Sequence, residues 1–300
     1  MVAPARHKYL RNSSPGSGDS RISVIGGLTW DTITNIHFQG QETLGGAAAY
    51  FGLSARQYTS SVSLFGFRSN TIPEETLRRL ADKIDISSLR IAPESSLKFS
   101  IYYDRSWKAR YVTDNPGALQ AIDSHVARRA IRLARAVHLC PLASLRQQLQ
   151  LAQGIRQDKP EIFISVMIFG PRLNEASSEL QRLLQVADLV FLSNEDLEHA
   201  AGIVMGDLTE VSRRCRASLV ITLGESGACF VSGGRETYYR CERTDPVDVT
   251  GAGDSFSGAF IGSLMKGYPI DRCLRNASLL AKISILSLGA SDLLALPQGS

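Results

Sequence analysis

Cysteine is scarce in this chain, and its few cysteines are not spaced for metal binding. The 300 residues include five cysteines, an odd number, and no two of them form a Cys-x-x-Cys pair. Such spacing favours free thiols in a reducing compartment over a disulfide framework or a zinc site. We therefore expect a cytoplasmic protein.

Long hydrophobic runs and a large excess of one charge are also absent. No apolar run approaches the ~18 residues of a membrane-spanning helix, and the formal net charge is only +4. Arg128, Arg129, Arg132 and Arg135 recur at the spacing of one solvated helix face. The sequence thus predicts neither a membrane nor a nucleic-acid partner. Its hydrophobic content of 44% and its length suit one large α/β domain or two small ones.

Several common enzyme motifs are missing or incomplete. The sequence contains neither the Walker pattern Gly-x-x-x-x-Gly-Lys-Ser/Thr nor Gly-x-Gly-x-x-Gly, which argues against a P-loop enzyme and a simple dinucleotide oxidoreductase. Gly224-Glu-Ser-Gly227 resembles part of the hydrolase nucleophile elbow, but Ala228 stands where that motif has its last glycine. A hydrolase also needs a histidine after the serine, and none of the five histidines follows Ser226.

The most informative stretch runs from Asp245 to Gly267. Pro246 and the β-branched residues after it disfavour a helix before Gly251. Beyond Asp254, apolar residues recur at helical spacing as far as Gly267. The pattern predicts that Gly251-Ala252-Gly253 is a tight turn capping a helix, with Asp254 in its first turn. Backbone N–H groups there form a nest for an anion, although a carboxylate at this place can also simply cap the helix.

Strand and helix patterns alternate along the remaining chain. The expected strands cover 21–27, 61–66, 136–140, 162–166, 189–192 and 219–223, and the expected helices cover 73–84, 144–157, 177–186 and 196–201. This alternation predicts a parallel sheet with helices on both faces and ligands at the carboxyl ends of its strands. Residues 97–113 instead have the pattern of a β-hairpin. Residues 1–20 predict a disordered tail, with an organelle transit peptide as the alternative.

The string Asp-x-Thr-Gly-Ala-Gly-Asp at 248–254, followed by an apolar helix, resembles the signature of the ribokinase (PfkB) family of carbohydrate kinases. The resemblance covers residues 21–297. It implies an α/β fold, a ribokinase-like three-layer sandwich whose mostly parallel central sheet carries a small β lid, which we assign to about 29–43 and 97–113. It further implies that Gly251, Ala252 and Gly253 bind the charge of the transferring phosphoryl group. Asp254 would be the base that deprotonates the acceptor hydroxyl.

The same resemblance implies binding residues elsewhere in the chain. Asp31, Gly45 and Gly46 match positions that contact the sugar. Residues matching the ATP site are Ser193, Thr222, Gly224, Gly227 and Thr250. Asp248 matches a position near a monovalent cation such as K⁺. Counted back from Gly202, Asp196 falls where the family has an acid that organises Mg²⁺; counted from Asn194, Leu197 would take that place. We prefer Asp196 because it keeps an oxygen ligand for that hard cation. Ser193 and Asp196 also suit an ordinary helix N-cap with an acidic first turn.

Three features depart from the family pattern. Tyr50 stands where the family usually has Asn, 67–70 replace a Gly-Asp-Asp-like turn, and Met167 lies at or near the place of a frequent Asp. These changes leave the phosphoryl-transfer half intact and alter the acceptor half. We expect an ATP-dependent kinase acting on a hydroxyl of a sugar or related polyol. A nucleoside kinase of the same family and a non-catalytic ligand-binding relative are the alternatives, and a lid-mediated homodimer is a further expectation from the resemblance.

Overall fold

A computed structural model of the chain describes residues 21–93, 97–115, 117–170, 177–200 and 208–297. The expected tail at 1–20 lies outside these described residues. Within them, no helix is long and apolar enough to cross a membrane.

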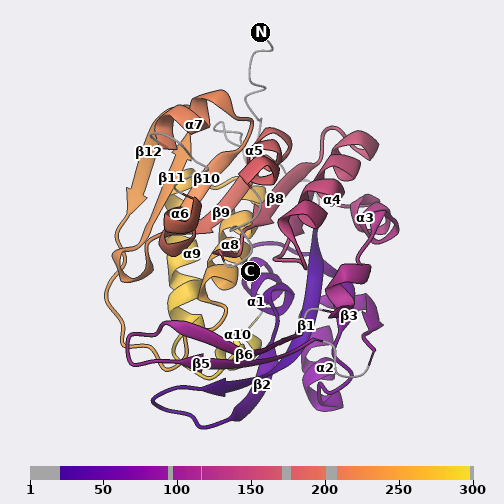
Figure 1. Cartoon of the computed structure of the whole chain (residues 1–300), viewed down its shortest axis with the longest axis vertical. Coiled ribbons are helices and arrows are strands. Elements are labelled where there is room, and N and C mark those ends of the chain that lie inside the picture. Colours follow the sequence, from indigo (N-terminus) through magenta and orange to yellow (C-terminus); the bar gives the residue numbers. More distant parts are fainter. Residues whose placement is uncertain (1–20, 94–96, 116, 171–176, 201–207, 298–300) are drawn as a thin grey trace.

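A mostly parallel sheet forms the centre of the molecule (Figure 1). Its parallel strands lie in the order β4-β3-β1-β7-β8-β9-β10. Their bounds are β1 (Ile22–Thr34), β3 (Val62–Arg68), β4 (Asp85–Ile91), β7 (Ala136–Leu139), β8 (Phe163–Met167), β9 (Leu189–Ser193) and β10 (Ser218–Thr222). Two antiparallel strands, β11 (Ala228–Ser232) and β12 (Arg235–Tyr239), extend the sheet beyond β10.

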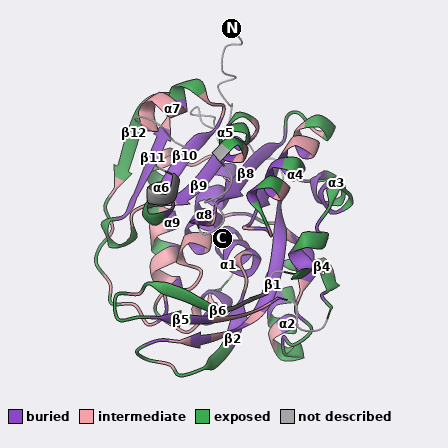
Figure 2. Cartoon of the chain, in the orientation of Figure 1, coloured by how far each residue is buried: buried purple, intermediate pink, exposed green. Residues whose placement is uncertain are grey.

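Helices cover both faces of this sheet, because alternate side chains of its buried strands point to opposite sides. On β9, for example, Phe191 joins one apolar cluster and Val190 the other. The first cluster includes α1 (Ala47–Ala55), α2 (Glu74–Ala81), α8 (Ala252–Met265), α9 (Ile270–Ser284) and α10 (Ser291–Ala295). The second includes α3 (Ser124–Ile131), α4 (Leu145–Asp158), α5 (Ser177–Val186) and α7 (Leu208–Arg214). Figure 2 shows buried inner strands between helices with exposed outer faces, so the expected three-layer sandwich is confirmed.

The second half of β1 leaves the central sheet and enters a small one. Residues 29–33 pair with β2 (Gln41–Gly45) in antiparallel register, and 32–34 pair with β5 (Lys98–Tyr103) in parallel register. A hairpin joins β5 to β6 (Ala109–Asn115). We call β2, β5, β6 and the second half of β1 the small sheet; it lies at the lower side of Figure 1. These strands overlap the segments assigned to a lid, about 29–43 and 97–113, and extend beyond them to Gly45 and Asn115. Their closure over a ligand stays a prediction.

The structure also differs in detail from the sequence-based expectations. Gly251 adopts the left-handed conformation and α8 begins at Ala252, so Ala252 and Gly253 belong to the first helical turn rather than to a turn before it. Strand β4 was not expected. Its residues do not alternate between buried and exposed positions, because β4 lies at the edge of the sheet.

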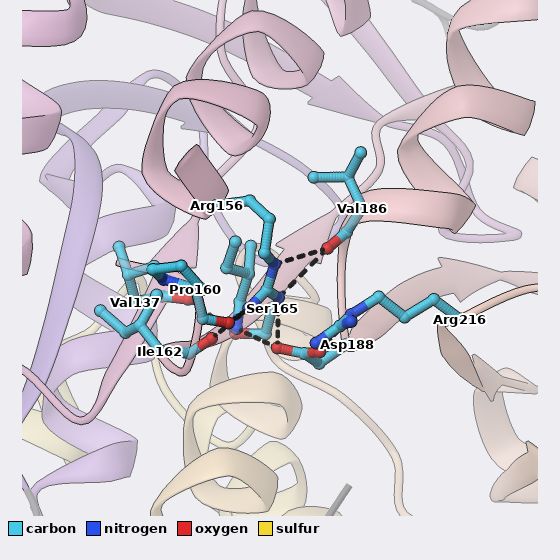
Figure 3. Close-up of polar contacts among 9 residues, drawn as sticks. Val137, Arg156, Pro160, Ile162, Ser165, Val186, Asp188 and Arg216 are labelled. Atoms are coloured by element: carbon cyan, nitrogen blue, oxygen red, sulfur yellow. Dashed lines mark hydrogen bonds and ion pairs between the residues drawn. The ribbon is translucent and has the colours of Figure 1, made fainter. Parts of the chain in front are cut away.

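A buried ion cluster of Arg156, Asp188 and Arg216 lies at the amino ends of the central strands (Figure 3). The Asp188 side chain is only 1% exposed and meets Nη2 of Arg156 at 2.7 Å and Nε of Arg216 at 2.9 Å. It also accepts the backbone N–H of Ile164 at 2.8 Å. The cluster thereby links α4 with the starts of β8, β9 and β10, at the sheet edge opposite the carboxyl ends where α/β proteins bind ligands.

Candidate active site

The first turn of α8 supplies the predicted anion nest. Gly251 has φ 74° and ψ 7°, a conformation that glycine adopts without strain. The N–H of Ser255 donates to the carbonyl of Gly251 at 2.8 Å, and the N–H of Ala252 donates to that of Val249 at 3.3 Å. The N–H groups of Gly253 and Asp254 lie in the first helical turn and have no hydrogen-bond acceptor within the helix. Together with the helix dipole they can bind an anion.

Asp254 lies one residue beyond this glycine turn. Asp254 is half-buried, and desolvation of its carboxyl raises its pKa to about 7, because a charged carboxylate is poorly solvated there. Burial and then the charge of Asp254 raise the pKa of the Cys140 thiol well above its usual range. Cys140 follows β7, so Asp254 faces the carboxyl edge of the central sheet. A carboxyl with a pKa near neutrality can accept a proton at physiological pH.

Asp31 lies on the part of β1 that belongs to the small sheet and is 3% exposed. Its carboxylate accepts hydrogen bonds from Oγ1 of Thr29 at 2.8 Å and from the N–H of Phe99 at 3.3 Å. The N–H of Gly46 also donates to it. Burial nevertheless dominates and raises the pKa of Asp31 to about 7, with a smaller contribution from the charge of Asp248.

Gly45 and Gly46 let the backbone approach this carboxylate. Gly46 has φ 89° and precedes the first residue of α1. A Cβ there would overlap the carbonyl oxygen of Gly27, and a Cβ on Gly45 would overlap the Asp31 carboxylate. Both glycines therefore position Asp31 at the amino end of α1.

Asp248 lies at the centre of a hydrogen-bonded chain and is fully buried. Its Oδ1 accepts from the N–H and the hydroxyl of Thr250 at 3.0 and 2.7 Å, and its Oδ2 accepts the N–H of Gly289 at 2.9 Å. The hydroxyls of Thr250 and Tyr103 lie 2.9 Å apart. Because Tyr103 is on β5, this series of hydrogen bonds connects the small sheet to the residues that precede the α8 turn.

Four of the five predicted nucleotide residues, all except Thr250, lie at the carboxyl ends of β9 and β10. Ser193 and Thr222 pair across these strands. Gly224 and Gly227 flank a turn in which the N–H of Gly227 donates to the carbonyl of Gly224 at 3.2 Å. Gly227 has φ 106°, and a Cβ there would overlap the carbonyl oxygen of Tyr239.

Ser193 and Asp196 bond reciprocally at the start of α6 (Asn194–Ala200). The N–H of Ser193 donates to Oδ2 of Asp196 at 2.6 Å, and the N–H of Asp196 donates to Oγ of Ser193 at 3.0 Å. This is a helix-capping pair. The described residues contain no group of three or more His, Cys, Asp or Glu side chains that could enclose a metal. A Mg²⁺ ion held mainly by phosphates and one carboxylate fits this donor set.

Sequence reasoning did not single out Thr29, Cys140 or Tyr103 as site residues. Thr29 carried a detectable signal, since it lies two residues from Asp31 on a strand and therefore on the same face. Tyr103 and Cys140 come from distant segments, and no local pattern connects either of them with residues 248–254. The predicted acceptor and phosphoryl residues come together through β1, α1 and α8.

A separate hollow opens at the amino edge of the sheet. It has a volume of about 590 Å³. Its lining includes Arg21, Ser61, Arg129 and Arg132. None of the predicted site residues is among the residues that line it. Since ligands of parallel α/β sheets bind at the carboxyl edge, the site described above is the better candidate.

Comparison with known proteins agrees with this geometry. The model of the pfkB family of carbohydrate kinases matches residues 74–297. This chain belongs to that family. Kinases of this family are phosphotransferases that use ATP. Membership of the family therefore confirms the reaction class expected from the string at residues 248–254.

Individual relatives of this pfkB-family chain differ in coverage. The ribokinase of Bacillus subtilis (strain 168) is 39% identical over 95 residues, which are 31% of this chain and 32% of that protein. The cytidine kinase of Thermococcus kodakarensis is 24% identical over 269 residues, 85% of this chain and 92% of that protein. The crystal structure of the Methanocaldococcus jannaschii nucleoside kinase superposes with a TM-score of 0.75 at 19% identity, covering 91% of this chain and 94% of that one. That last likeness supports the fold.

Proposed function

We propose that this pfkB-family kinase transfers the γ-phosphoryl group of ATP to a hydroxyl of a sugar or nucleoside, with Asp254 as the general base. The observation that carries the proposal is the position of Asp254. It lies in the first turn of α8, directly after the Gly251 turn, and burial raises its pKa to about 7. A base is most effective when its pKa lies near the operating pH.

In the proposed reaction, a carboxylate oxygen of Asp254 takes the proton of the acceptor hydroxyl. The acceptor oxygen forms a bond to the γ-phosphorus as the bond from that phosphorus to the β,γ-bridging oxygen breaks, and ADP leaves. The N–H groups of Gly253 and Asp254 donate to the charged oxygens of the transferring group, with Ala252 and the helix dipole beside them. These groups stabilise the charge where it develops.

The other predicted residues bind and orient the two substrates. Asp31, held by Gly45 and Gly46, accepts hydrogen bonds from acceptor hydroxyls, which suits a polyol because one carboxylate accepts several donors. ATP lies along the ends of β9 and β10, against Ser193, Thr222, Gly224, Gly227 and Thr250. The small sheet closes over the acceptor and excludes water, which limits hydrolysis of ATP.

Two ions belong to this proposal. Asp196 would hold Mg²⁺, which would neutralise charge on the ATP phosphates. A monovalent cation such as K⁺ would bind near Asp248, whose carboxylate connects Thr250 to the loop at Gly289. The lid-mediated homodimer and the cytoplasmic location remain predictions.

A nucleoside is as well supported as a free sugar for the acceptor. The cytidine kinase noted above aligns with 85% of this chain, whereas the ribokinase match is shorter. An ADP-release assay with ATP and Mg²⁺ tests both classes, using sugars, cyclitols, sugar phosphates and nucleosides. Asp254→Asn and the exposed Asp245→Asn are assayed alongside. Turnover that Asp254→Asn loses and Asp245→Asn keeps supports the proposal; equal turnover by both variants contradicts it.

A further inference from the structure

The ring of Tyr50 packs against the glycine of the anion turn. Tyr50 lies in the first turn of α1 and is 1% exposed. A Cβ on Gly251 would overlap Cγ, Cδ1 and Cδ2 of this ring. The aromatic ring therefore lies against the Cα of Gly251 and supports the turn that opens α8.

The hydroxyl of Tyr50 has no such structural role. It is buried and has no hydrogen-bond partner among the described residues. A buried polar atom without a partner costs about 1–3 kcal/mol, and a phenylalanine would pack its ring in the same place without that cost. The free protein thus keeps a hydroxyl that its own fold does not satisfy, and such a group calls for a specific explanation.

Ionisable groups of the candidate site surround the Tyr50 side chain. Burial, and then the charges of Asp248 and Asp31 and the nearby Tyr103 and Asp254, raise the pKa of Tyr50 well above its usual range. The phenol is therefore neutral and can donate a hydrogen bond. It lies within electrostatic reach of both carboxylates that the proposed function assigns to the acceptor, Asp31 and Asp254.

Two sulfur-containing side chains lie near the start of α8. Met167 lies at the end of β8, where its Cε would contact a Cβ on Gly253 at 3.8 Å. Cys140 lies close enough to Asp254 to interact with its charge. Nε2 of Gln148 already donates to the backbone carbonyl of Cys140 at 2.8 Å and to that of Met167 at 2.9 Å. Sulfur side chains are weak hydrogen-bond acceptors, so the partner of Tyr50 is expected to come from a ligand.

We propose that the Tyr50 hydroxyl donates a hydrogen bond to an oxygen of the acceptor, next to the hydroxyl that is phosphorylated, and so selects acceptors that carry this oxygen. The inference rests on the proposed function. Asp31 recognises acceptor hydroxyls as donors, whereas Tyr50 recognises an oxygen as an acceptor, such as a ring oxygen or a neighbouring hydroxyl. Together they favour a furanose-type polyol over a simple alcohol.

Tyr50→Phe tests the assignment because it removes only the hydroxyl. We expect kcat/KM for the acceptor to fall about 3- to 10-fold, as for one neutral hydrogen bond, with the KM for ATP unchanged. The melting temperature of the free protein should stay the same or rise, since an unsatisfied group is lost. Tyr58→Phe, just beyond the same helix, is the matched control.

Acceptor analogues identify the oxygen. Wild type and Tyr50→Phe are compared on ribose, 2-deoxyribose, cytidine and adenosine, and on the 2′-deoxy, 3′-deoxy and carbocyclic forms of both nucleosides. The analogue that lacks the recognised oxygen should be phosphorylated equally by the two proteins. Equal kcat/KM on every acceptor overturns the role of Tyr50 while leaving the kinase proposal standing. So does a lower melting temperature of the free variant with kcat/KM unchanged.

A different result marks failure of the proposed function itself. If the wild type phosphorylates no compound in the panel, that proposal is contradicted first. The rise in melting temperature that each compound produces then decides the role of Tyr50. A smaller rise for Tyr50→Phe than for wild type supports the hydrogen bond, and identical or absent shifts in both proteins overturn it.

Discussion

Gly45 leaves open the space that the carboxylate of Asp31 occupies, because a Cβ on residue 45 would overlap its Oδ2. The two residues lie on neighbouring strands of the small sheet, β2 and β1. Asp31 thus provides the carboxylate, and Gly45, which has no side chain, leaves room for it. The position of Asp31 depends on this pairing.

Gly45→Ala should therefore displace Asp31 without unfolding the protein. We expect kcat/KM for the acceptor to fall about 10- to 100-fold, the equivalent of a hydrogen bond to a charged group, with the KM for ATP unchanged. Gly154→Ala in α4 is the control, since a Cβ there meets nothing within 4 Å. Normal acceptor kinetics for Gly45→Ala would contradict the assigned role of Asp31.

Asp254 should determine how activity depends on pH. Its pKa is raised to about 7 by burial, so the fraction of ionised base grows as the pH rises. We expect kcat/KM to increase between about pH 6 and pH 8, and Asp31, also raised to about 7, should steepen the rise. Asp254→Asn should lower kcat about 10²- to 10⁴-fold. A flat profile in the wild type would argue against Asp254 as the base.

The same carboxyl should make the wild type less stable at high pH. A folded-state pKa near 7 lies above the ordinary value of 3.8, so the folded protein holds its proton more tightly than the unfolded chain. Stability then falls as the pH rises from about 4 to 7. Asp254→Asn should melt at a higher temperature than wild type at pH 8, and the difference should vanish below about pH 4. The exposed Asp245→Asn serves as the control for loss of one negative charge at the surface.

Asp196→Asn separates the capping role of this residue from its proposed metal role. Asparagine keeps an oxygen that can accept the N–H of Ser193 and therefore preserves the cap, but it removes the charge. We expect the apparent Mg²⁺ affinity to fall about 10- to 100-fold with the melting temperature little changed. Asp196→Ala removes both functions and should lower both quantities. An unchanged Mg²⁺ dependence in both variants would leave Asp196 with the cap alone.

The Asp188 cluster should control stability and not activity. Replacing one member of a buried ion pair leaves uncompensated charge, which costs about 3–5 kcal/mol of unfolding free energy. Asp188→Asn should show that loss in denaturant unfolding, with kcat unchanged where the protein stays folded. Asp158→Asn breaks the exposed pair with Arg128, whose side chains are 66% and 42% exposed. That change should cost less than about 1 kcal/mol.

The phosphoryl-transfer part of the site was predictable because its signal is local. Gly251 and Asp254 lie within one short string in which the turn and the helix start follow from neighbouring residue types. Much of the central sheet was predictable for the same reason, since buried strands and amphipathic helices alternate along the chain. The start of α8 differed by two residues, Ala252 and Gly253, because helix boundaries depend on hydrogen bonds that the residue pattern does not specify.

The acceptor part depends on contacts between distant segments. Asp31 is held by Phe99, and Tyr50 packs against Gly251. Tyr50 looked like a departure from the family pattern or one more packing aromatic, and nothing in the sequence indicated that its hydroxyl has no partner.

The sequence by itself determined the fold class and the turn before Asp254, because backbone preferences and hydrophobic periodicity act over a few residues. Only the tertiary structure decided which carboxyls are buried and where Tyr50 points. The raised pKa values of Asp31 and Asp254 arise from desolvation by residues far away in the chain. Desolvation depends on how the whole chain packs around a group.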